Sequence, residues 1–376
     1  MLRRLAQNWL VSLVFLSGLS LHVFAENPPE INASVQSQDP PKPRVAAEKK
    51  EVAPKKDFGF NAGEVIMEHI SDSHEWHFFT YKRADGTEVH ASICLPVIIY
   101  TPGAGLSIFS FKRLHHAPYK SFSLDTEGHI VRTDGRKFYD FSLTKNVIQL
   151  MISMVIMLLL FLTMTRNYKK YGTKAPRGLQ SALEVIVVFI RDEIAKPMLG
   201  KRADKFLPYL LTLFFFIWIN NMLGLIPGSA NVTGNIAITA TLALFTFILM
   251  MAGSKRTYWK HMIAPPGVPI AVLPILIPIE FISNIIVKPF ALMIRLFANM
   301  LAGHLIILSF MAIIFIFSAM NLFAGAGATI FSVAFSIFIY MLELLVAALQ
   351  AYIFTILTAL FIGETGVEDS HSGEHH

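Results

Sequence analysis

The sequence contains little charge and almost no cysteine. Asp, Glu, Lys and Arg together make up 15% of its 376 residues, against about 25% in an ordinary soluble protein. The single cysteine, Cys94, excludes an intramolecular disulfide and therefore a disulfide-stapled fold. Hydrophobic residues make up 54% of the chain, more than a soluble core can bury. This composition excludes disorder over the whole chain and indicates a membrane protein.

The sequence also lacks the features of a nucleotide-binding or nucleic-acid-binding protein. No G-x-x-x-x-G-K-[ST] phosphate loop is present, so we expect no bound ATP. The net charge is +6, but after residue 145 most Lys and Arg residues lie in two groups, at 166–205 and 255–260. Such groups between apolar runs mark the cytoplasmic side of a membrane. We expect no nucleic-acid partner, no cofactor and no metal.

The first 141 residues divide into three parts. Residues 1–25 have a charged start, an apolar middle and small residues at the end, which predicts a secretory signal peptide; an uncleaved short anchor is the alternative. Residues 26–57 are rich in Pro, Lys and Glu and predict a disordered linker. Residues 58–141 have soluble composition and predict a small, mainly β module outside the membrane.

Two features of the module are specific. Asp85-Gly86 and Asp134-Gly135 are turn signals between strand-like runs at 76–81, 89–100, 106–111 and 121–131. Three histidines, His69, His74 and His77, are either metal ligands or surface residues. We favour surface residues, because no pattern of Cys or carboxylate residues completes a site. The sequence does not reveal what the module does.

Residues 142–362 predict an all-α polytopic membrane domain with five crossings. The apolar runs lie at about 146–165, 206–226, 235–253, 268–318 and 329–362, and the last two must tilt or bend to fit one bilayer. Residues 178–198 are amphipathic but too charged to span, so we expect an interfacial helix. The basic groups predict an inner-membrane protein with a periplasmic N-terminal module and a cytoplasmic tail at 363–376.

Only four charged residues lie between positions 270 and 363: Glu280, Lys288, Arg295 and Glu343. An arginine at mid-bilayer depth costs at least about 2.5 kcal/mol by insertion scales. Arg295 is therefore either a functional group with an acidic partner or a side chain that snorkels near a helix end. Because apolar sequence extends far beyond it, we favour function.

Helical spacing predicts where the polar residues of this region lie. At 100° per residue, Arg295 and Asn299 share a face, whereas His304 is on the opposite face. Glu343 and Gln350, seven residues apart, share a face of the last helix. The two helices could therefore line two separate polar paths. Alternatively, His304 and Glu343 are a buried pair that only holds the helices together.

Two motifs carry a family resemblance: Ile294–Met300 (IRLFANM) with Ala302-Gly303-His304, and Leu349–Phe354 (LQAYIF). Over about residues 142–362 the sequence resembles subunit a of the F-type ATP synthase, the stator half of its proton channel. Ala298 stands where many members have glycine. Some members have the His304 and Glu343 residue types exchanged, which supports the two acting together.

The resemblance implies a mechanism and partners. Protons would enter one half-channel, reach a carboxylate on a ring of small hairpin subunits (subunit c), and leave through the other half-channel after the ring turns. Arg295 would face that carboxylate, and the outer path would be lined by Asn299, His304, Glu343, Gln350, Glu280 and Asn221. A peripheral stalk (subunit b) and a soluble ATP synthase head complete the expected complex. Protons are preferred over sodium because His304 suits proton relay.

Two other functions remain open from the sequence. A stand-alone secondary transporter or ion channel would fit the proline-rich residues 265–289, although no inverted repeat is found. A non-transporting membrane scaffold gives Arg295 no role. The His residues of the tail, His371, His375 and His376, could bind a metal, but we favour a solvated tail.

Overall fold

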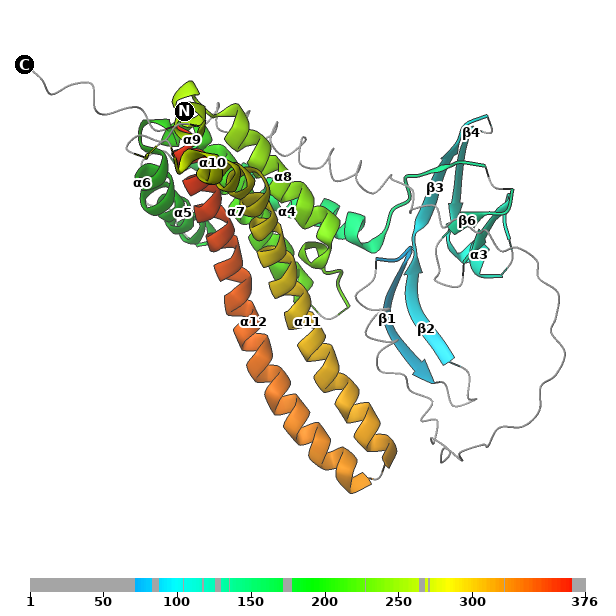
Figure 1. Ribbon diagram of the computed structural model, residues 1–376. Coiled ribbons are helices and arrows are strands. Elements are labelled where there is room, and N and C mark those ends of the chain that lie inside the picture. The colour runs from blue at the N-terminus through cyan, green and yellow to red at the C-terminus, as the bar shows by residue number, and fades with distance from the viewer. Residues whose placement is uncertain are drawn as a thin grey trace, which may run out of the picture.

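The computed structural model describes most of the chain from Asp72 to Gly366. The described ranges are 72–82, 88–103, 105–116, 118–125, 130–134, 136–171, 178–226, 228–263, 268–269, 271–320 and 322–366. The expected signal peptide, the linker, His69, the side chain of His77 and the histidines of the tail lie outside them. A helical bundle forms the larger part, and the β module lies at one end of it, near the start of α4 (Figure 1).

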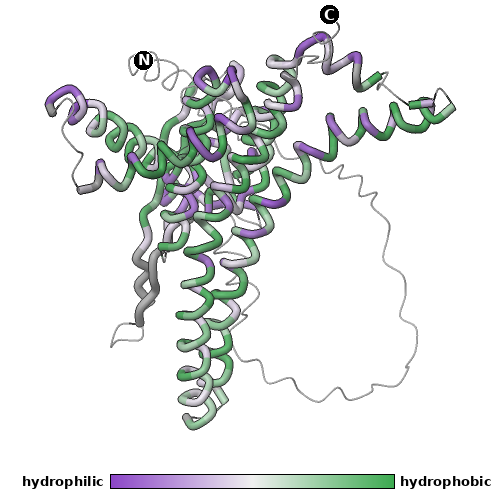
Figure 2. The backbone as a smooth tube through the Cα atoms, turned by 90° about the vertical axis from the view of Figure 1, so that its left-hand side faces the viewer, coloured by the Kyte–Doolittle hydropathy of each residue, from purple (hydrophilic) through white to green (hydrophobic). Residues whose placement is uncertain are grey.

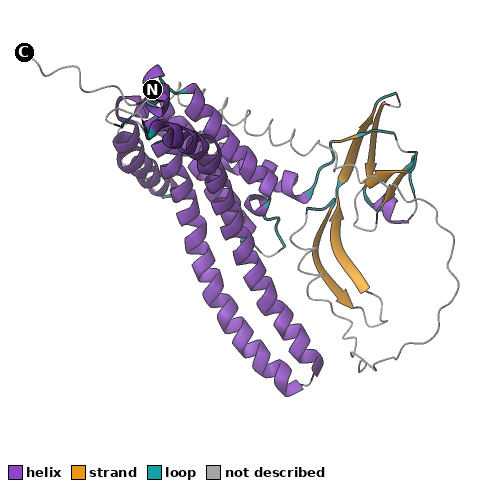
Figure 3. Cartoon of the chain, in the orientation of Figure 1, coloured by secondary structure: helices purple, strands orange, loops and turns teal. Residues whose placement is uncertain are grey.

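The module consists of short antiparallel strands (Figure 3). Strand β1 (Glu75–Lys82) pairs with β2 (Glu88–Cys94), and β5 (Phe122–Leu124) pairs with β6 (Ile130–Arg132). A three-stranded sheet has the order β4-β3-β7, with β3 at Pro96–Thr101, β4 at Gly105–Ser110 and β7 at Tyr139–Asp140. Short helix α3 (Lys112–His116) follows β4. Alternate residues point inward and form a small core: Val97, Ile99, Phe109, Phe111, Leu114, Phe122 and Ile130. The expected strand runs are thus present.

The bundle contains long apolar helices at the expected places. They are α4 (Lys145–Tyr171), α7 (Ala203–Gly224), α8 (Ile236–Ala252), α11 (Lys288–Met320) and α12 (Leu322–Glu364). Among the described residues, four stretches are long and apolar enough to cross a membrane: 145–170, 180–224, 273–318 and 323–364; α8 is apolar but has only 17 residues. This confirms a mostly helical chain with membrane helices, while the number of crossings stays a prediction.

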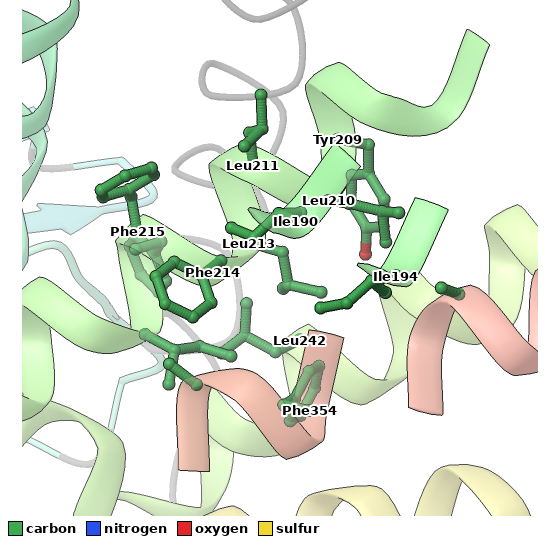
Figure 4. Close-up of a cluster of buried hydrophobic side chains, with 14 of the residues drawn as sticks. Ile190, Ile194, Tyr209, Leu210, Leu211, Leu213, Phe214, Phe215, Leu242 and Phe354 are labelled. Atoms are coloured by element: carbon green, nitrogen blue, oxygen red, sulfur yellow. The ribbon is translucent and has the colours of Figure 1, made fainter. Parts of the chain in front are cut away.

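The segment expected as an interfacial helix does not lie apart from the bundle. It forms α5 (Leu179–Phe189), a π-helical turn η1 (Ile190–Ala195) and α6 (Lys196–Leu199), joined to α7 through the short 3-10 turn η2 (Gly200–Arg202). Ile190 and Ile194 are fully buried in the core together with Leu210 and Leu213 of α7 and Phe354 of α12 (Figure 4). The charged residues of 178–198 lie on one side, so the apolar side is free to pack inward.

A pair of helices, α11 and α12, extends away from the rest of the bundle as a long hairpin (Figure 1), and its tube is mostly hydrophobic (Figure 2). Residues 319–328 were expected to be a connection, but α12 already begins at Leu322. The glycines of this segment lie inside the helix. A Cβ on Gly325 would be 2.8 Å from the Cα of Ser318, so glycine lets the two helices approach closely at their junction.

Shorter helices precede and join the long ones. A 3-10 turn, η3 (Val232–Gly234), lies between α7 and α8, and α9 (Arg256–Ile263) follows α8. Helix α10 (Leu273–Ile282) and the π-helical turn η4 (Ser283–Val287) lead into α11. The run expected at 268–318 is therefore three helical pieces in succession, in accordance with its prolines.

Candidate functional site

Two polar contacts join α11 and α12 along their facing sides. The Asn299 side-chain amide donates to Oε1 of Gln350 at 2.8 Å. The Nδ1 atom of His304 lies 3.5 Å from Oε1 of Glu343. The structure therefore brings together four of the residues expected from the sequence, in two pairs that each bridge the same two helices.

The His304–Glu343 pair is buried and incompletely bonded. The side chains of His304 and Glu343 are 15% and 3% exposed. Neither oxygen of the Glu343 carboxyl group, nor Nδ1 of His304, has a hydrogen-bond partner among the described residues. Burying an unbonded carboxylate is costly. This pair therefore favours a bound proton or water molecules, which is the chemistry of a proton relay.

Space for the Glu343 carboxyl group comes from Gly303. A Cβ at Gly303 would lie 2.2 Å from Oε1 of Glu343 and 2.7 Å from its carboxyl carbon. Only a residue without a side chain allows the carboxyl group to lie against the α11 backbone at this point. The sequence analysis quoted Gly303 as part of a motif but gave it no role, because clearance against another helix leaves no signal in sequence spacing.

Asn221 of α7 connects this pair of helices to the loop between α7 and α8. Its amide donates to the backbone oxygen of Ala347 in α12 at 3.2 Å, and its oxygen accepts from the Thr233 hydroxyl at 2.6 Å. Asn231 of the same loop donates to the backbone oxygen of Met300 in α11 at 3.2 Å. The loop thus contacts both long helices, each about one turn from the His304–Glu343 pair.

Arg295 differs from the other basic residue of α11. Its side chain is exposed, and it makes no hydrogen bond or ion pair with any residue that the structure describes. Lys288, by contrast, lies 2.5 Å from Oε2 of Glu364. An exposed, unpaired guanidinium group on an apolar helix requires an anionic partner from outside the chain if it lies in a membrane.

Glu280 lies apart from the group in which the sequence analysis had put it. It is in α10, where it is close enough to Tyr258 to raise the pKa of that phenol together with Glu364, although burial is the main cause of the shift. Glu364 is 21 residues beyond Glu343 on α12, which corresponds to about 31 Å of helix. Glu280 is therefore near the C-terminal end of α12, not beside the His304–Glu343 pair.

Polar residues that the sequence analysis did not single out lie on α4. Asn146, Gln149 and Ser153 are buried, and Oδ1 of Asn146 and Nε2 of Gln149 have no hydrogen-bond partner among the described residues. Asn220 of α7 is also buried, with its Oδ1 unbonded within the same part of the chain. Spacings of three and seven residues on α4 are a helical-face signal that could have identified the first three.

The histidines of the module do not form a metal site in the part of the chain that the structure describes, where no group of three potential metal ligands occurs. His74 packs its ring on Phe111, with 5.2 Å between ring centroids, and its Nε2 lies 3.7 Å from Oδ2 of Asp140. These contacts give His74 a structural environment between the module's sheet and the segment that enters α4.

Comparison with known proteins identifies both parts of the chain. Residues 147–363 match the family described as ATP synthase A chain, and residues 65–149 match a domain of unknown function, DUF8433. The "ATP synthase subunit a" of Chloroherpeton thalassium is 44% identical over 244 residues, covering 63% of this chain and 71% of that protein. The "ATP synthase subunit a 2" of Prosthecochloris aestuarii is 46% identical over 242 residues, covering 63% and 72%.

A third relative extends further toward the N-terminus. The "ATP synthase subunit a 2" of Chlorobium luteolum is 40% identical over 323 residues, covering 84% of this chain and 80% of that protein. Because residues 147–363 are little more than half of the chain, this alignment must include part of the β module. The family match and these identities show that the chain belongs to the ATP synthase A chain family, as an F-type ATP synthase subunit a and a multi-pass membrane protein of ATP synthesis and proton transport.

Proposed function

We propose that the chain is the proton-conducting stator subunit of a rotary ATP synthase, with two half-channels that serve a rotating ring of carboxylate-bearing subunits. The observation that carries the proposal is Arg295, an exposed and unpaired guanidinium group on the apolar helix α11. At a distance of 4 Å and an effective dielectric constant near 20, a guanidinium group and a carboxylate attract each other by about 4 kcal/mol. Such a contact favours the ionised form of the ring carboxylate, so the carboxylate releases its proton as it passes Arg295.

The half-channel on the module side uses the polar residues that link α7, α11 and α12. Asn221 and the His304–Glu343 pair lie within one helical turn of each other along α12, and Asn299 with Gln350 continues the polar side of the two helices. Because Glu343 has no hydrogen-bond donor among the described residues, it can accept a proton and pass it on.

The second half-channel lies toward the other end of α12. Glu280, beside Tyr258 and near Glu364, supplies the acidic group there. This assignment replaces the sequence-based expectation that Glu280 lines the outer path. The arrangement separates the two acidic groups along the bundle, and Arg295 lies between them in the sequence of α10 and α11, where it blocks a direct leak of protons.

The proposal includes the partners and orientation that the family relationship suggests. A ring of hairpin subunits supplies the moving carboxylate, a peripheral stalk holds the chain still, and a soluble head makes ATP. The module is periplasmic, and the C-terminus is cytoplasmic in a bacterial inner membrane. A stand-alone transporter is the less favoured alternative, because it leaves Arg295 without an acidic partner.

The test is Arg295→Ala in the assembled complex. We expect the complex to assemble and to lose both ATP synthesis and ATP-driven proton pumping, because the guanidinium group is removed while the helix is kept. Pumping is measured as acidification of inverted membrane vesicles, and assembly as co-purification of the hairpin subunits.

Lys288→Ala is the matched control, since it removes a basic residue from the same helix that already has a partner in Glu364. We expect it to retain most of the pumping. Retained pumping in the Arg295→Ala complex, or proton transport by the purified chain without a ring, contradicts the proposed function.

A further inference from the structure

The β module contacts the membrane domain at a single loop beyond its covalent connection. The indole N–H of Trp76, at the start of β1, donates to the backbone oxygen of Gly228 at 2.6 Å, across 152 positions of sequence. The segment just before β1 also follows α4: the backbone N–H of Lys145 donates to Ser73, and that of Asn146 donates to the carboxyl group of Asp72. These bonds fix where the Trp76 side chain lies relative to the bundle.

Gly228 belongs to a loop, 225–235, that is held together by its own polar groups. The Ser229 hydroxyl donates to the backbone oxygens of Leu223 at 2.6 Å and Ile226 at 2.7 Å. Gly228 itself has a φ of +82°, a conformation that glycine adopts without strain. The loop therefore behaves as one compact unit, and a force on Gly228 acts on all of it.

The same loop contacts both long helices next to the His304–Glu343 pair. Asn231 donates to the oxygen of Met300, four residues before His304, and Thr233 bonds Asn221, which in turn donates to Ala347, four residues after Glu343. Each contact is therefore about one helical turn from the pair. The loop sets how far apart α11 and α12 lie at this level.

We propose that the module is a clamp on this loop, and that the Trp76–Gly228 hydrogen bond holds the half-channel on the module side in its conducting arrangement. Trp76 is a positioning residue: it acts through the loop and does not touch the path itself. This inference rests on the proposed function of the chain. It gives a role to the part of the sequence that matches only a domain of unknown function. The Chlorobium luteolum relative, whose alignment reaches into the module, is expected to have the same arrangement.

The test uses Trp76→Phe, which keeps an aromatic ring and removes the N–H donor, in membranes that contain the whole complex. After removal of the soluble head, passive proton conduction is measured against pH on the module side. Hydrogen exchange of the amides at 228–235 is measured in the same preparation. We expect conduction to fall about fivefold, the usual effect of losing one hydrogen bond, with a shifted pH profile and faster exchange in the loop.

Three further variants separate the clamp from general effects. Gly228→Ala alters the acceptor side, since alanine resists a positive φ, and we expect it to reduce conduction as Trp76→Phe does. Trp259→Phe removes a tryptophan N–H that donates to Ser254 at 3.0 Å after the other end of α8. Phe122→Leu loosens the buried core of the module without touching Trp76. The last two are expected to leave conduction and loop exchange unchanged.

The outcomes are decisive. Unchanged conduction in Trp76→Phe, or reduced conduction without faster loop exchange, overturns the proposal. Equal losses in Phe122→Leu and Trp76→Phe also overturn it, because module stability would then be the cause. Should the unaltered complex show no Arg295-dependent proton flow, the proposed function fails separately, and loop exchange alone then decides whether Trp76 holds the loop.

Discussion

Replacing Gly303 with alanine is the smallest change that tests the geometry of the proton path. In α11, Gly303 lies against the carboxyl group of Glu343, and a Cβ there would be 2.2 Å from Oε1, 2.7 Å from the carboxyl carbon and 3.1 Å from the Cγ. Contacts below about 3.0 Å do not persist, so Glu343 must move. In the helix itself alanine is favoured over glycine by about 1 kcal/mol, so helix formation is not impaired.

The size of the effect follows from the distance that must be recovered. Moving Oε1 from 2.2 Å to an ordinary contact near 3.4 Å requires a displacement of about 1 Å. Overpacking of this kind costs about 1 to 3 kcal/mol. Because His304 and Glu343 are already 3.5 Å apart, the displacement separates them beyond proton-transfer distance. A misplacement of about 1 Å in a reacting group can reduce a rate about 100-fold, and we expect a loss of 10- to 100-fold here.

The assay is ATP-driven proton pumping by inverted vesicles, with passive conduction after removal of the soluble head as the second reading. Gly327→Ala is the matched control, since a Cβ on Gly327 meets nothing within 4 Å in α12. Assembly is checked by the amount of complex in the membrane. Near-normal pumping is expected for Gly327→Ala.

A compensating change adds to the test. Glu343→Asp shortens the acidic side chain by one methylene, so we expect Gly303→Ala combined with Glu343→Asp to conduct better than Gly303→Ala alone. If Gly303→Ala pumps as well as the unaltered complex, the carboxyl group of Glu343 does not need its position against α11, and the reasoning about this pair is refuted.

Two further variants test the module and the end of α12. Burial raises the pKa of Asp72 above its usual 3.8, even though Thr144, Asn146 and Lys145 partly oppose the shift; the folded module thus binds this proton more tightly than the unfolded chain, and its stability is lost as the pH rises through the folded pKa. We expect Asp72→Asn to remove that loss, at about 1.4 kcal/mol for each pKa unit; urea-dependent protease cleavage of the module at pH 4 and pH 7 measures it, and an unchanged pH dependence contradicts it. At Gly363, a Cβ would lie 2.3 Å from the backbone oxygen of Met198, so Gly363→Ala is expected to lower stability by about 1 to 3 kcal/mol; thermal unfolding of the solubilised complex measures this, and an unchanged midpoint argues against close packing of α12 on α6.

Properties that depend on local sequence were predictable here. Low charge and long apolar runs predicted the membrane class and the positions of α4, α7, α8, α11 and α12, because hydropathy and helical periodicity act over neighbouring residues. The strand runs of the module followed from alternation and turn signals in the same way. Where glycine-rich sequence suggested a connection at 319–328, the prediction was wrong, because close packing at Gly325 outweighs its weak helix propensity.

The candidate site was predicted only in part, for a physical reason. The sequence by itself identified Arg295, His304, Glu343 and Gln350, since charged and polar residues are rare and costly inside apolar helices. Which of these residues meet depends on how helices far apart in the sequence pack. Tertiary packing alone put Glu280 at the far end of α12, required glycine at 303 beside the carboxyl group of Glu343, and brought Trp76 to Gly228, because spacing along one helix carries no information about the surface of another.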